Sequence, residues 1–328
     1  MEKLLTIVIC VYNGEKYIIE TLQSVCNQIV KNFQLLIVDD CSTDGTVQCA
    51  EKYLKEHAGF KYEIYTFSEN GGLAKARYFA ERYVKTKYII FLDADDLLLP
   101  EATDKYLSKI ESDSDLIAVG CYLDFIDEFS KRIPGGLYIG SKTKEEFWRK
   151  ASSNKLIFMH PTSIFSVEYA LKVGGHNIKG FPDGKPRYQD MCEDLELWTR
   201  MSDLYKEGKA IIVLPEVLCL YRKTDNSVST NTLAMKLRMK HIKENLLRRR
   251  KGLDELSYID FRNNLTREEY QKIERDVKAT DAFRKSGFAF IEKRYFRAIT
   301  YGIQALIASP KYVWQKFKPF IKRKVTNR

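Results

Sequence analysis

The sequence has 328 residues, 45% of them hydrophobic, and this composition excludes an intrinsically disordered chain. The seven cysteines lack the Cys-x-x-Cys and Cys/His spacing of zinc sites, and their odd number indicates reduced thiols instead of a disulfide framework. No signal peptide is visible, and no segment reaches the ~18 uninterrupted apolar residues of a membrane-spanning helix, so we expect a cytoplasmic protein.

The positive charge is concentrated in the last third of the chain. Residues 1–230 contain 29 Lys and Arg against 34 Asp and Glu, whereas residues 231–328 contain 25 against 10. The net charge of +10 therefore combines a mildly acidic body with a strongly basic extension. We expect the body to have two halves, 1–120 and 121–230. The charge of the extension indicates an anionic partner surface.

The first 120 residues alternate between strand-like and helix-like segments. Short apolar, β-branched runs predict the strands, and a 3.6-residue apolar period predicts the helices between them. The predicted strands cover 4–11, 33–39, 61–67 and 88–92, and the predicted helices cover 15–28, 44–57 and 73–84. Single helices between successive strands indicate right-handed βαβ units, and therefore an α/β fold with a mostly parallel sheet.

This regular alternation ends after residue 120. Residues 133–136 (IPGG) predict a turn between two aromatic-rich strands, and Pro215 separates predicted strands at 211–214 and 217–221. A helix is predicted from residue 193 to about residue 204, after a loop rich in glycine and proline. The basic extension has helix-forming composition throughout, without repeats.

Three carboxylates, Asp93, Asp95 and Asp96, follow the fourth predicted strand within four positions. In open α/β sheets the carboxyl ends of the strands form the crevice where ligands bind. Repulsion among these carboxylates must be relieved by protonation, by basic partners or by a divalent cation, and hard cations prefer oxygen ligands. A solvated turn that caps the next helix would use the same residues, so both interpretations stay open here.

Polar residues also follow the other predicted strands. Tyr12 and Asn13 follow the first strand, and Asp40 follows the second. After the third strand, the segment 70–72 (NGG) lets the backbone approach a ligand closely, and Arg77 lies about one helical turn further on. Neither a G-x-G-x-x-G motif nor a P-loop is present, although helix capping alone could account for one such aspartate.

A second acidic pair, Glu193 and Asp194, begins the helix predicted at 193–204. The helix macrodipole favours carboxylates at a helix N-terminus. The same position keeps a carboxylate ionised, as a general base must be. Capping and catalysis therefore predict the same residue type, and spacing alone does not separate them.

Five segments together resemble the motifs of glycosyltransferase family 2, which has the GT-A fold. They are TIVICVYN (6–13), QLLIVDDCSTDGT (34–46), NGGLAKAR (70–77), YIIFLDADDL (88–97) and EDLELWTR (193–200). The resemblance covers about residues 4–222 and implies a Rossmann-like, mostly parallel sheet with flanking helices, followed by a helical basic extension. It also implies an inverting enzyme. The Q-x-x-R-W motif of processive members is missing, which favours single addition.

The resemblance implies roles for the residues at the strand ends. Val11, Tyr12 and Asp40 would line the uracil and ribose site of a UDP-sugar in the nucleotide-binding half, and Arg77 would help to hold the nucleotide. Further substrate contacts would be Asn13, Asn70, Gly72, Asp93, Ala94, Glu193, Trp198 and Arg222, with His160 on the acceptor side.

The resemblance also implies a metal site and a base. Asp93 and Asp95 would form the D-x-D pair that binds Mg²⁺ or Mn²⁺, with Asp95 as the more direct ligand. Asp194 would deprotonate the acceptor hydroxyl. The cation would bridge the diphosphate and neutralise the leaving group.

Three positions depart from the family pattern. Cys10 replaces a common proline, and Tyr78 replaces a common asparagine after the arginine. Thr224 stands where many members have a histidine, which puts a third protein ligand for the metal in doubt. Arg222 and Ser227 remain as expected diphosphate contacts.

The end of the basic extension interleaves aromatic and basic residues. Residues 288–328 contain ten Lys and Arg against one acidic residue. Such segments suit the interface of an anionic membrane, and we favour this over nucleic acid, which polybasic segments also bind. We therefore expect a peripheral protein on the inner face of the cell membrane, acting on a sugar carried by a polyprenyl diphosphate. A homodimer stays open.

The preferred hypothesis is a hexosyltransferase of bacterial capsule, O-antigen or exopolysaccharide synthesis. A sugar nucleotidyltransferase is the alternative enzyme, but its Gly-rich basic signature is missing from residues 4–14. A non-catalytic basic adaptor for membranes or nucleic acid is the alternative without chemistry. That adaptor would keep its function when Asp95 is replaced.

Overall fold

The structure is a computed structural model that describes residues 4–224, 231–291 and 293–316. The chain divides into two compact units, one of residues 1–228 and 242–255 and the other of residues 229–241 and 256–328. The second segment of the first unit, residues 242–255, belongs to the part of the sequence that we expected to form a separate extension.

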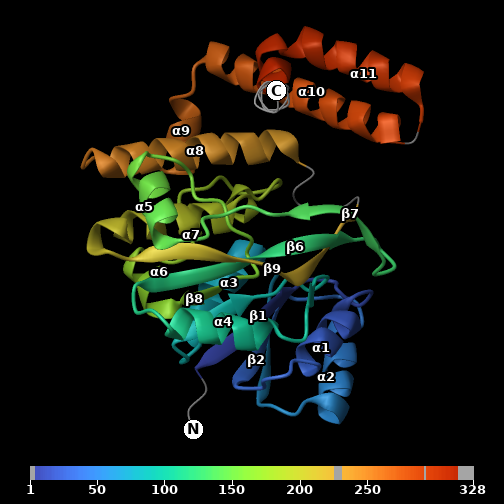
Figure 1. Cartoon of the computed structure of the whole chain (residues 1–328), viewed down its shortest axis with the longest axis vertical. Coiled ribbons are helices and arrows are strands. Elements are labelled where there is room, and N and C mark those ends of the chain that lie inside the picture. The colour runs from blue at the N-terminus through green and yellow to red at the C-terminus, as the bar shows by residue number, and fades with distance from the viewer. Residues whose placement is uncertain (1–3, 225–230, 292, 317–328) are drawn as a thin grey trace, which may run out of the picture. The chain divides into compact units, whose positions relative to one another are not determined.

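The first half of the first unit is a series of βαβ units (Figure 1). Its elements are β1 (Leu5–Val11), α1 (Ile18–Cys26), β2 (Phe33–Asp39), α2 (Thr46–His57), β3 (Tyr62–Thr66), α3 (Leu73–Tyr83) and β4 (Tyr88–Phe91). β1 pairs in parallel with β2 and β4, and β2 pairs in parallel with β3. These findings confirm the predicted order of elements, and the predicted bounds agree to within a few residues.

The second half adds antiparallel pairs to the same sheet. Its elements are β5 (Leu97–Leu98), α4 (Ala102–Glu111), β6 (Leu116–Ile126), β7 (Arg132–Leu137), α5 (Lys144–Ser152), β8 (Ile164–Ser166), α6 (Val167–Lys172), η1 (Tyr188–Asp190), α7 (Glu193–Met201), η2 (Ser202–Glu207) and β9 (Ala210–Arg222). The strand order is β3-β2-β1-β4-β8-β6-β9-β5, with β7 paired to β6. β8 is antiparallel to β4 and β6, whereas β6 and β9 are parallel. Most paired residues are in parallel register, which confirms the predicted α/β fold.

Two predictions for the second half are wrong. Residues 133–136, predicted as a turn, lie within β7, and the turn of this hairpin is at 127–131 instead. β7 pairs only with β6, and a proline is tolerated on such an edge strand. The two strands predicted on either side of Pro215 are one strand, β9, because Pro215 and Glu216 form a bulge between adjacent pairs to β6.

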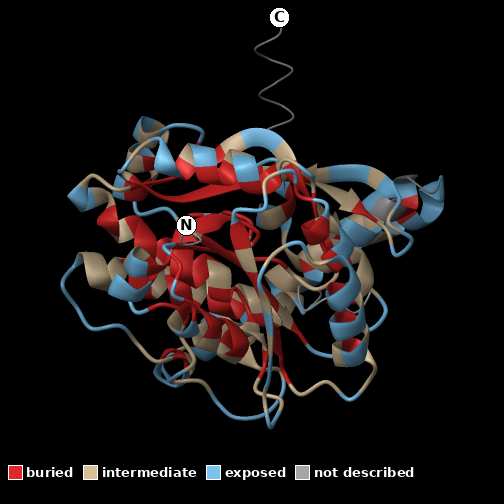
Figure 2. Ribbon diagram, turned by 90° about the horizontal axis from the view of Figure 1, so that it is seen from below, coloured by how far each residue is buried: buried red, intermediate tan, exposed pale blue. Residues whose placement is uncertain are grey.

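The core of the first unit lies on both faces of the sheet. Figure 2 shows the buried residues gathered in the strands and on the inner sides of the flanking helices. The continuous apolar run of β1, LTIVICV, suits a strand that is covered on both faces. This packing leaves the carboxyl ends of β1, β2 and β4 at one edge of the sheet, where the loops carry the polar motifs.

The second unit is helical in the residues that the structure describes. The helices are α8 (Thr232–Arg250), α9 (Tyr258–Asn263), α10 (Arg267–Ile291) and α11 (Tyr295–Ala308), and α8 contributes residues to both units. α10 and α11 run side by side (Figure 1). In the described part of the chain, no helix combines the length and apolar character needed to cross a membrane.

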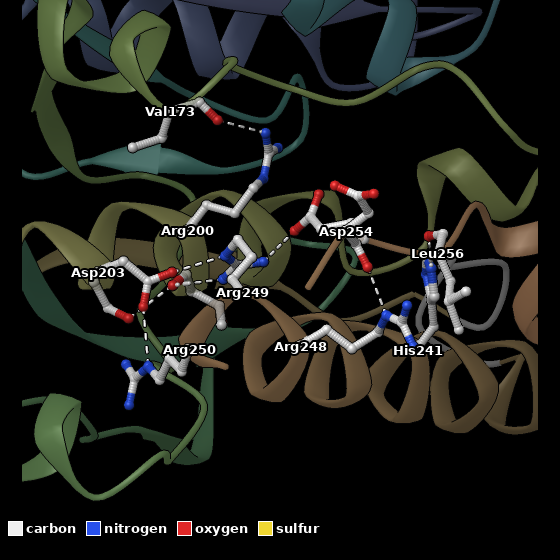
Figure 3. Close-up of polar contacts among 12 residues, drawn as sticks. Val173, Arg200, Asp203, His241, Arg248, Arg249, Arg250, Asp254 and Leu256 are labelled. Atoms are coloured by element: carbon white, nitrogen blue, oxygen red, sulfur yellow. Dashed lines mark hydrogen bonds and ion pairs between the residues drawn. The ribbon is translucent and has the colours of Figure 1, made fainter. Parts of the chain in front are cut away.

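The arginine run at the end of α8 forms ion pairs within the first unit (Figure 3). Arg249 Nε and Arg250 Nε bind the two carboxylate oxygens of Asp203, at 2.7 and 3.0 Å. Arg248 Nε donates to the carbonyl oxygen of Asp254 at 2.6 Å. Part of the positive charge of residues 231–328 is therefore neutralised locally.

Candidate active site

The loops that follow β1 and β2 are joined by hydrogen bonds. The N–H of Asn13 donates to Ser42 Oγ, and Asn13 Oδ1 accepts from the N–H of Thr43, both at 2.8 Å. Asn13 has a φ of 51°, in the left-handed region that asparagine tolerates. Val11 is buried, whereas Tyr12 is half exposed. The ring of Tyr12 is thus accessible at the carboxyl edge of the sheet.

The carboxylate of Asp40 is held by the loop before α3. The N–H groups of Gly71 and Gly72 donate to its two oxygens at 2.7 Å, and Asn70 Nδ2 donates at 3.0 Å. Gly72 has a φ of +93°, and a Cβ there would lie 2.5 Å from Asp190 Oδ2, so only glycine fits. Asp40, Asn70 and Gly72, which come from separate motifs, therefore form one hydrogen-bonded group.

Two residues of the loop before α7 complete this group, and the sequence analysis did not identify either. Asp190 Oδ1 accepts from the N–H of Ala74 at 2.8 Å, in the first turn of α3. Arg187 Nη2 donates to the carbonyl oxygen of Asn70 at 2.7 Å. Burial raises the pKa of Asp190. The available signal was a basic and an acidic residue in a loop of glycines and prolines.

Arg77 connects two acidic motifs that are far apart in the sequence. Arg77 Nη2 binds Asp93 Oδ1 and Nη1 binds Glu193 Oε1, each at 2.6 Å. Arg77 is 2% exposed, and its guanidinium lies 5.3 Å from the ring centre of Phe91. Burial lowers the pKa of Arg77, but the Glu193 and Asp93 carboxylates raise it further, so the net shift is upward. The cluster thus holds a permanent cation between β4 and α7.

Asp194 follows Glu193 in the first turn of α7. Burial raises the pKa of Asp194, and the Arg77 guanidinium opposes part of this rise. Burial also raises the pKa of Glu193, again against Arg77, to which Glu193 is bound directly. A carboxylate whose pKa lies above the ordinary aspartate range is better suited to accept a proton from a substrate.

Asp93 and Asp95 present oxygen ligands at the end of β4. Burial, and then the charge of Asp93, raise the pKa of Asp95 to about 6. A cation would relieve this repulsion, so the donor chemistry fits Mg²⁺ or Mn²⁺. In the described residues no group of three or more His, Cys, Asp or Glu side chains could hold a metal ion. The remaining ligands would therefore come from a diphosphate and water. The carbonyl of Ala94, between the two aspartates, accepts from Thr21 Oγ1 at 2.9 Å.

Asp96, the third carboxylate of this segment, is fully buried. Its Oδ1 accepts from the N–H of Arg222 at 2.9 Å. Its Oδ2 lies 3.9 Å from His160 Nε2, and both atoms lack a hydrogen-bond partner among the described residues. Burial lowers the pKa of His160 to about 4, so the ring is neutral at neutral pH.

Two residues assigned to substrate contacts are placed behind the site. His160 is buried next to Asp96, which does not suit an acceptor contact. Trp198 lies in the hydrophobic core, edge-to-face with Phe165 at 5.3 Å. The motif EDLELWTR places Trp198 on α7 but does not reveal which face of the helix it occupies. Ser227 lies outside the described residues.

Arg222 is also a structural residue, not an open diphosphate contact. It is buried, with Nε donating to the carbonyl of Asp95 at 2.8 Å and Nη1 to the carbonyl of Asp127 at 3.0 Å. Its Nη2 pairs with Glu20 Oε2 at 3.0 Å, and its guanidinium lies 4.3 Å from the ring centre of Tyr17. Arg222 therefore supports the loop of Asp95 from inside the protein.

A second buried pair, also missed from the sequence, lies behind α7. Glu81 of α3 accepts from the N–H of His176 at 2.7 Å and pairs with His176 Nδ1 at 2.8 Å. Arg200 of α7 donates to the carbonyl of Val173 at 2.8 Å, which ties the same turn to α7 (Figure 3). The charge of His176 slightly opposes the raised pKa of Asp194. The available signal was an acidic residue on the inner side of a helix.

Comparison with known sequences identifies the family. A family model described as "Glycosyl transferase family 2" matches residues 6–174. The putative teichuronic acid biosynthesis glycosyltransferase TuaG of Bacillus subtilis is 35% identical over 222 residues, which are 67% of this chain and 79% of that protein.

Solved structures share the fold at low sequence identity. One is S. aureus TarS 1-349 in complex with UDP-GlcNAc, with a TM-score of 0.54, 18% identity, and coverage of 91% of this chain and 90% of that one. Another is the mannosyltransferase PcManGT from Pyrobaculum calidifontis in complex with GDP-Man and Mn²⁺, with a TM-score of 0.52, 19% identity, and coverage of 95% and 88%. By sequence and by its GT-A fold, this chain belongs to glycosyltransferase family 2.

Proposed function

We propose that this enzyme transfers a hexose or N-acetylhexosamine from a UDP-sugar to a saccharide acceptor, with inversion, in bacterial surface polysaccharide synthesis. The observation that carries the proposal is the ion pairing of Arg77 with Asp93 and Glu193, both at 2.6 Å. These contacts join a candidate diphosphate site to the helix turn that holds Asp194. The printed functions of TuaG and the UDP-GlcNAc bound to TarS support the same class of chemistry.

The donor nucleotide would bind at the ends of β1 and β2. Tyr12 exposes its ring there, and Asn13 links the two loops. Asp40 is held in place by the N–H groups of Gly71 and Gly72, so its position is set before a ligand arrives. A preorganised polar group needs less reorganisation on binding than a mobile one.

The diphosphate would lie over the end of β4. Asp95 and, less directly, Asp93 would hold Mg²⁺ or Mn²⁺, because their oxygens suit hard cations. When bound, the cation supplies charge neutralisation for the leaving diphosphate. Arg77 fixes Asp93 through Nη2 and keeps the local charge from becoming more negative. Asp96, fully buried, would act only as support.

Asp194 would act as the general base. It would take the proton of the acceptor hydroxyl while that oxygen forms a bond to the anomeric carbon of the donor. The bond from the anomeric carbon to the diphosphate oxygen breaks on the opposite side, and UDP leaves. No covalent bond between sugar and enzyme forms, and the anomeric configuration inverts.

The acceptor sugar would be carried on a polyprenyl diphosphate at the inner face of the cell membrane. The basic, aromatic-rich sequence after residue 288 supports a peripheral position at such a surface. The proposal requires neither nucleic acid nor a second copy of the chain.

A panel of nucleotide sugars tests the proposal. With Mn²⁺ present, one or more UDP-sugars should raise the melting temperature, since a ligand of the native state stabilises by mass action. The same sugar should release UDP when saccharide acceptors are added. Release of pyrophosphate from UTP and a sugar 1-phosphate would support the sugar nucleotidyltransferase instead. Absence of stabilisation by every nucleotide sugar would contradict both enzymes.

A further inference from the structure

The helix α11 carries its large apolar side chains on the outside. Phe296, Ile299 and Ile307 are 85%, 64% and 78% exposed, and Ile303 and Leu306 are also exposed. These five positions recur at intervals of three and four residues, so they form one continuous stripe along the helix. We call these five residues the outer stripe.

The opposite side of α11 is made of small residues and packs on α10 (Figure 1). Ala298 and Ala305 are buried, and a Cβ at Gly302 would lie 3.6 Å from Ser286 Oγ of α10. Ser286 Oγ also donates to the carbonyl of Ala298 at 2.7 Å. The small residues let the two helices approach closely. This packing turns the outer stripe away from α10.

The outer stripe is flanked by positive charge alone. Residues 293–316 contain five Lys and Arg and no Asp or Glu. The five cations are exposed at the two ends of the helix pair: Lys293, Arg294, Arg297, Lys311 and Lys316. Tyr295 and Trp314, also exposed, stand beyond the two ends of the stripe. Aromatic side chains favour this level of a bilayer, where one end is apolar and the other is hydrated.

We infer that α11 lies in the plane of an anionic bilayer and inserts the outer stripe below the headgroups, with its cations on lipid phosphates. α11 has 14 residues, so it is roughly 21 Å long, shorter than the ~30 Å hydrocarbon core. A second copy of the chain on the same stripe would bring cations against cations, so charge favours anionic lipid. This inference is independent of the sugar chemistry. It assigns the main contact to apolar side chains, beyond the charge of the basic extension.

Binding of the full chain to lipid vesicles tests this inference. The wild-type protein should float with vesicles of phosphatidylglycerol and phosphatidylcholine. The double variant Phe296→Ser, Ile307→Ser should lower the partition coefficient about 100-fold, since each buried side chain contributes at least about tenfold. Arg294→Gln should lower it about fivefold, and on anionic vesicles only.

The matched control is Thr300→Ser, Gln304→Ser, which changes two exposed polar residues of the same helix. It should bind as the wild type does, and Ile307→Ser alone should lose about tenfold if the double variant is unstable. Unchanged binding by the double variant would overturn the inference. So would a wild-type protein that ignores vesicles and forms a dimer that the double variant breaks. UDP release with a water-soluble acceptor should be the same in all variants, so failure here leaves the catalytic proposal intact.

Discussion

The Arg77 cluster and the outer stripe of α11 depart from the usual distribution of side chains in opposite directions. Arg77 is buried with two carboxylates beside it, whereas α11 exposes five large apolar side chains. Neither arrangement is one that folding alone favours, because buried ion pairs carry a desolvation penalty and exposed apolar patches favour association. Both become favourable when a partner of the right chemistry binds. The two regions therefore point to two different partners, a charged ligand and an apolar surface.

Removing the buried cation is the most severe way to break this comparison. Arg77→Met should lower the free energy of unfolding by about 3–5 kcal/mol, because Asp93 and Glu193 lose their shared partner. Urea denaturation measures the change. Lys75→Met on the same helix is the control, since its pair with Glu69 is exposed and should contribute less than about 1 kcal/mol. Equal effects of the two substitutions would contradict a special role for Arg77.

Replacing the proposed metal ligand should reduce chemistry more than stability. Asp95→Ala should lower turnover about 10²- to 10³-fold and abolish its dependence on Mn²⁺, because several kcal/mol of leaving-group stabilisation are lost. Asp104→Ala, at an exposed position of α4, should leave UDP release unchanged. Turnover by Asp95→Ala that still responds to Mn²⁺ would show that the cation binds elsewhere.

Arg222 distinguishes a supporting residue from a ligand contact. Arg222→Met should lower the free energy of unfolding by about 2 kcal/mol, through lost charged hydrogen bonds to Asp95, Asp127 and Glu20. The KM for the donor, corrected for the folded fraction, should stay within about twofold. A stable variant with a greatly raised donor KM would return Arg222 to the diphosphate.

The smallest expected effect is on pH dependence. The pKa of Asp95, raised to about 6, lies above its value in the unfolded chain, so protonation favours the folded state. Without metal, stability should therefore fall as pH rises from about 4 to about 6. With metal, the proton competes, and the Kd for Mn²⁺ with UDP should rise about twofold from pH 7 to pH 6. In Asp95→Asn this contribution to both trends should vanish.

The sheet was predictable where local pattern and tertiary position agree. The apolar runs of β1, β2 and β4 are strands because their residues are buried on both faces, and the glycine and proline signals mark their ends. The prediction failed where tertiary pairing overrides local signals. Pro215 lies in a bulge that keeps β9 continuous, and Pro134 and its neighbouring glycines lie on an edge strand.

The candidate site was predictable by position more than by contact. Asp40, Asn70 and Gly72 were identified from motifs, and the structure joins them by hydrogen bonds. Motif spacing does not specify which side of an element a residue faces, so it did not separate buried Trp198 and Arg222 from ligand contacts. The same limit explains why the buried pair of Glu81 and His176 was missed. Contacts over about a hundred residues leave no local pattern.

Asp194→Asn tests the central claim most directly, because it removes the proposed base and keeps the size of the side chain. Binding of the UDP-sugar with Mn²⁺, followed by thermal shift, should match the wild type. Transfer to the acceptor should fall about 10²- to 10⁴-fold, the usual contribution of a general base. Transfer at the wild-type rate, with binding unchanged, would contradict the assignment of Asp194 and the mechanism built on it.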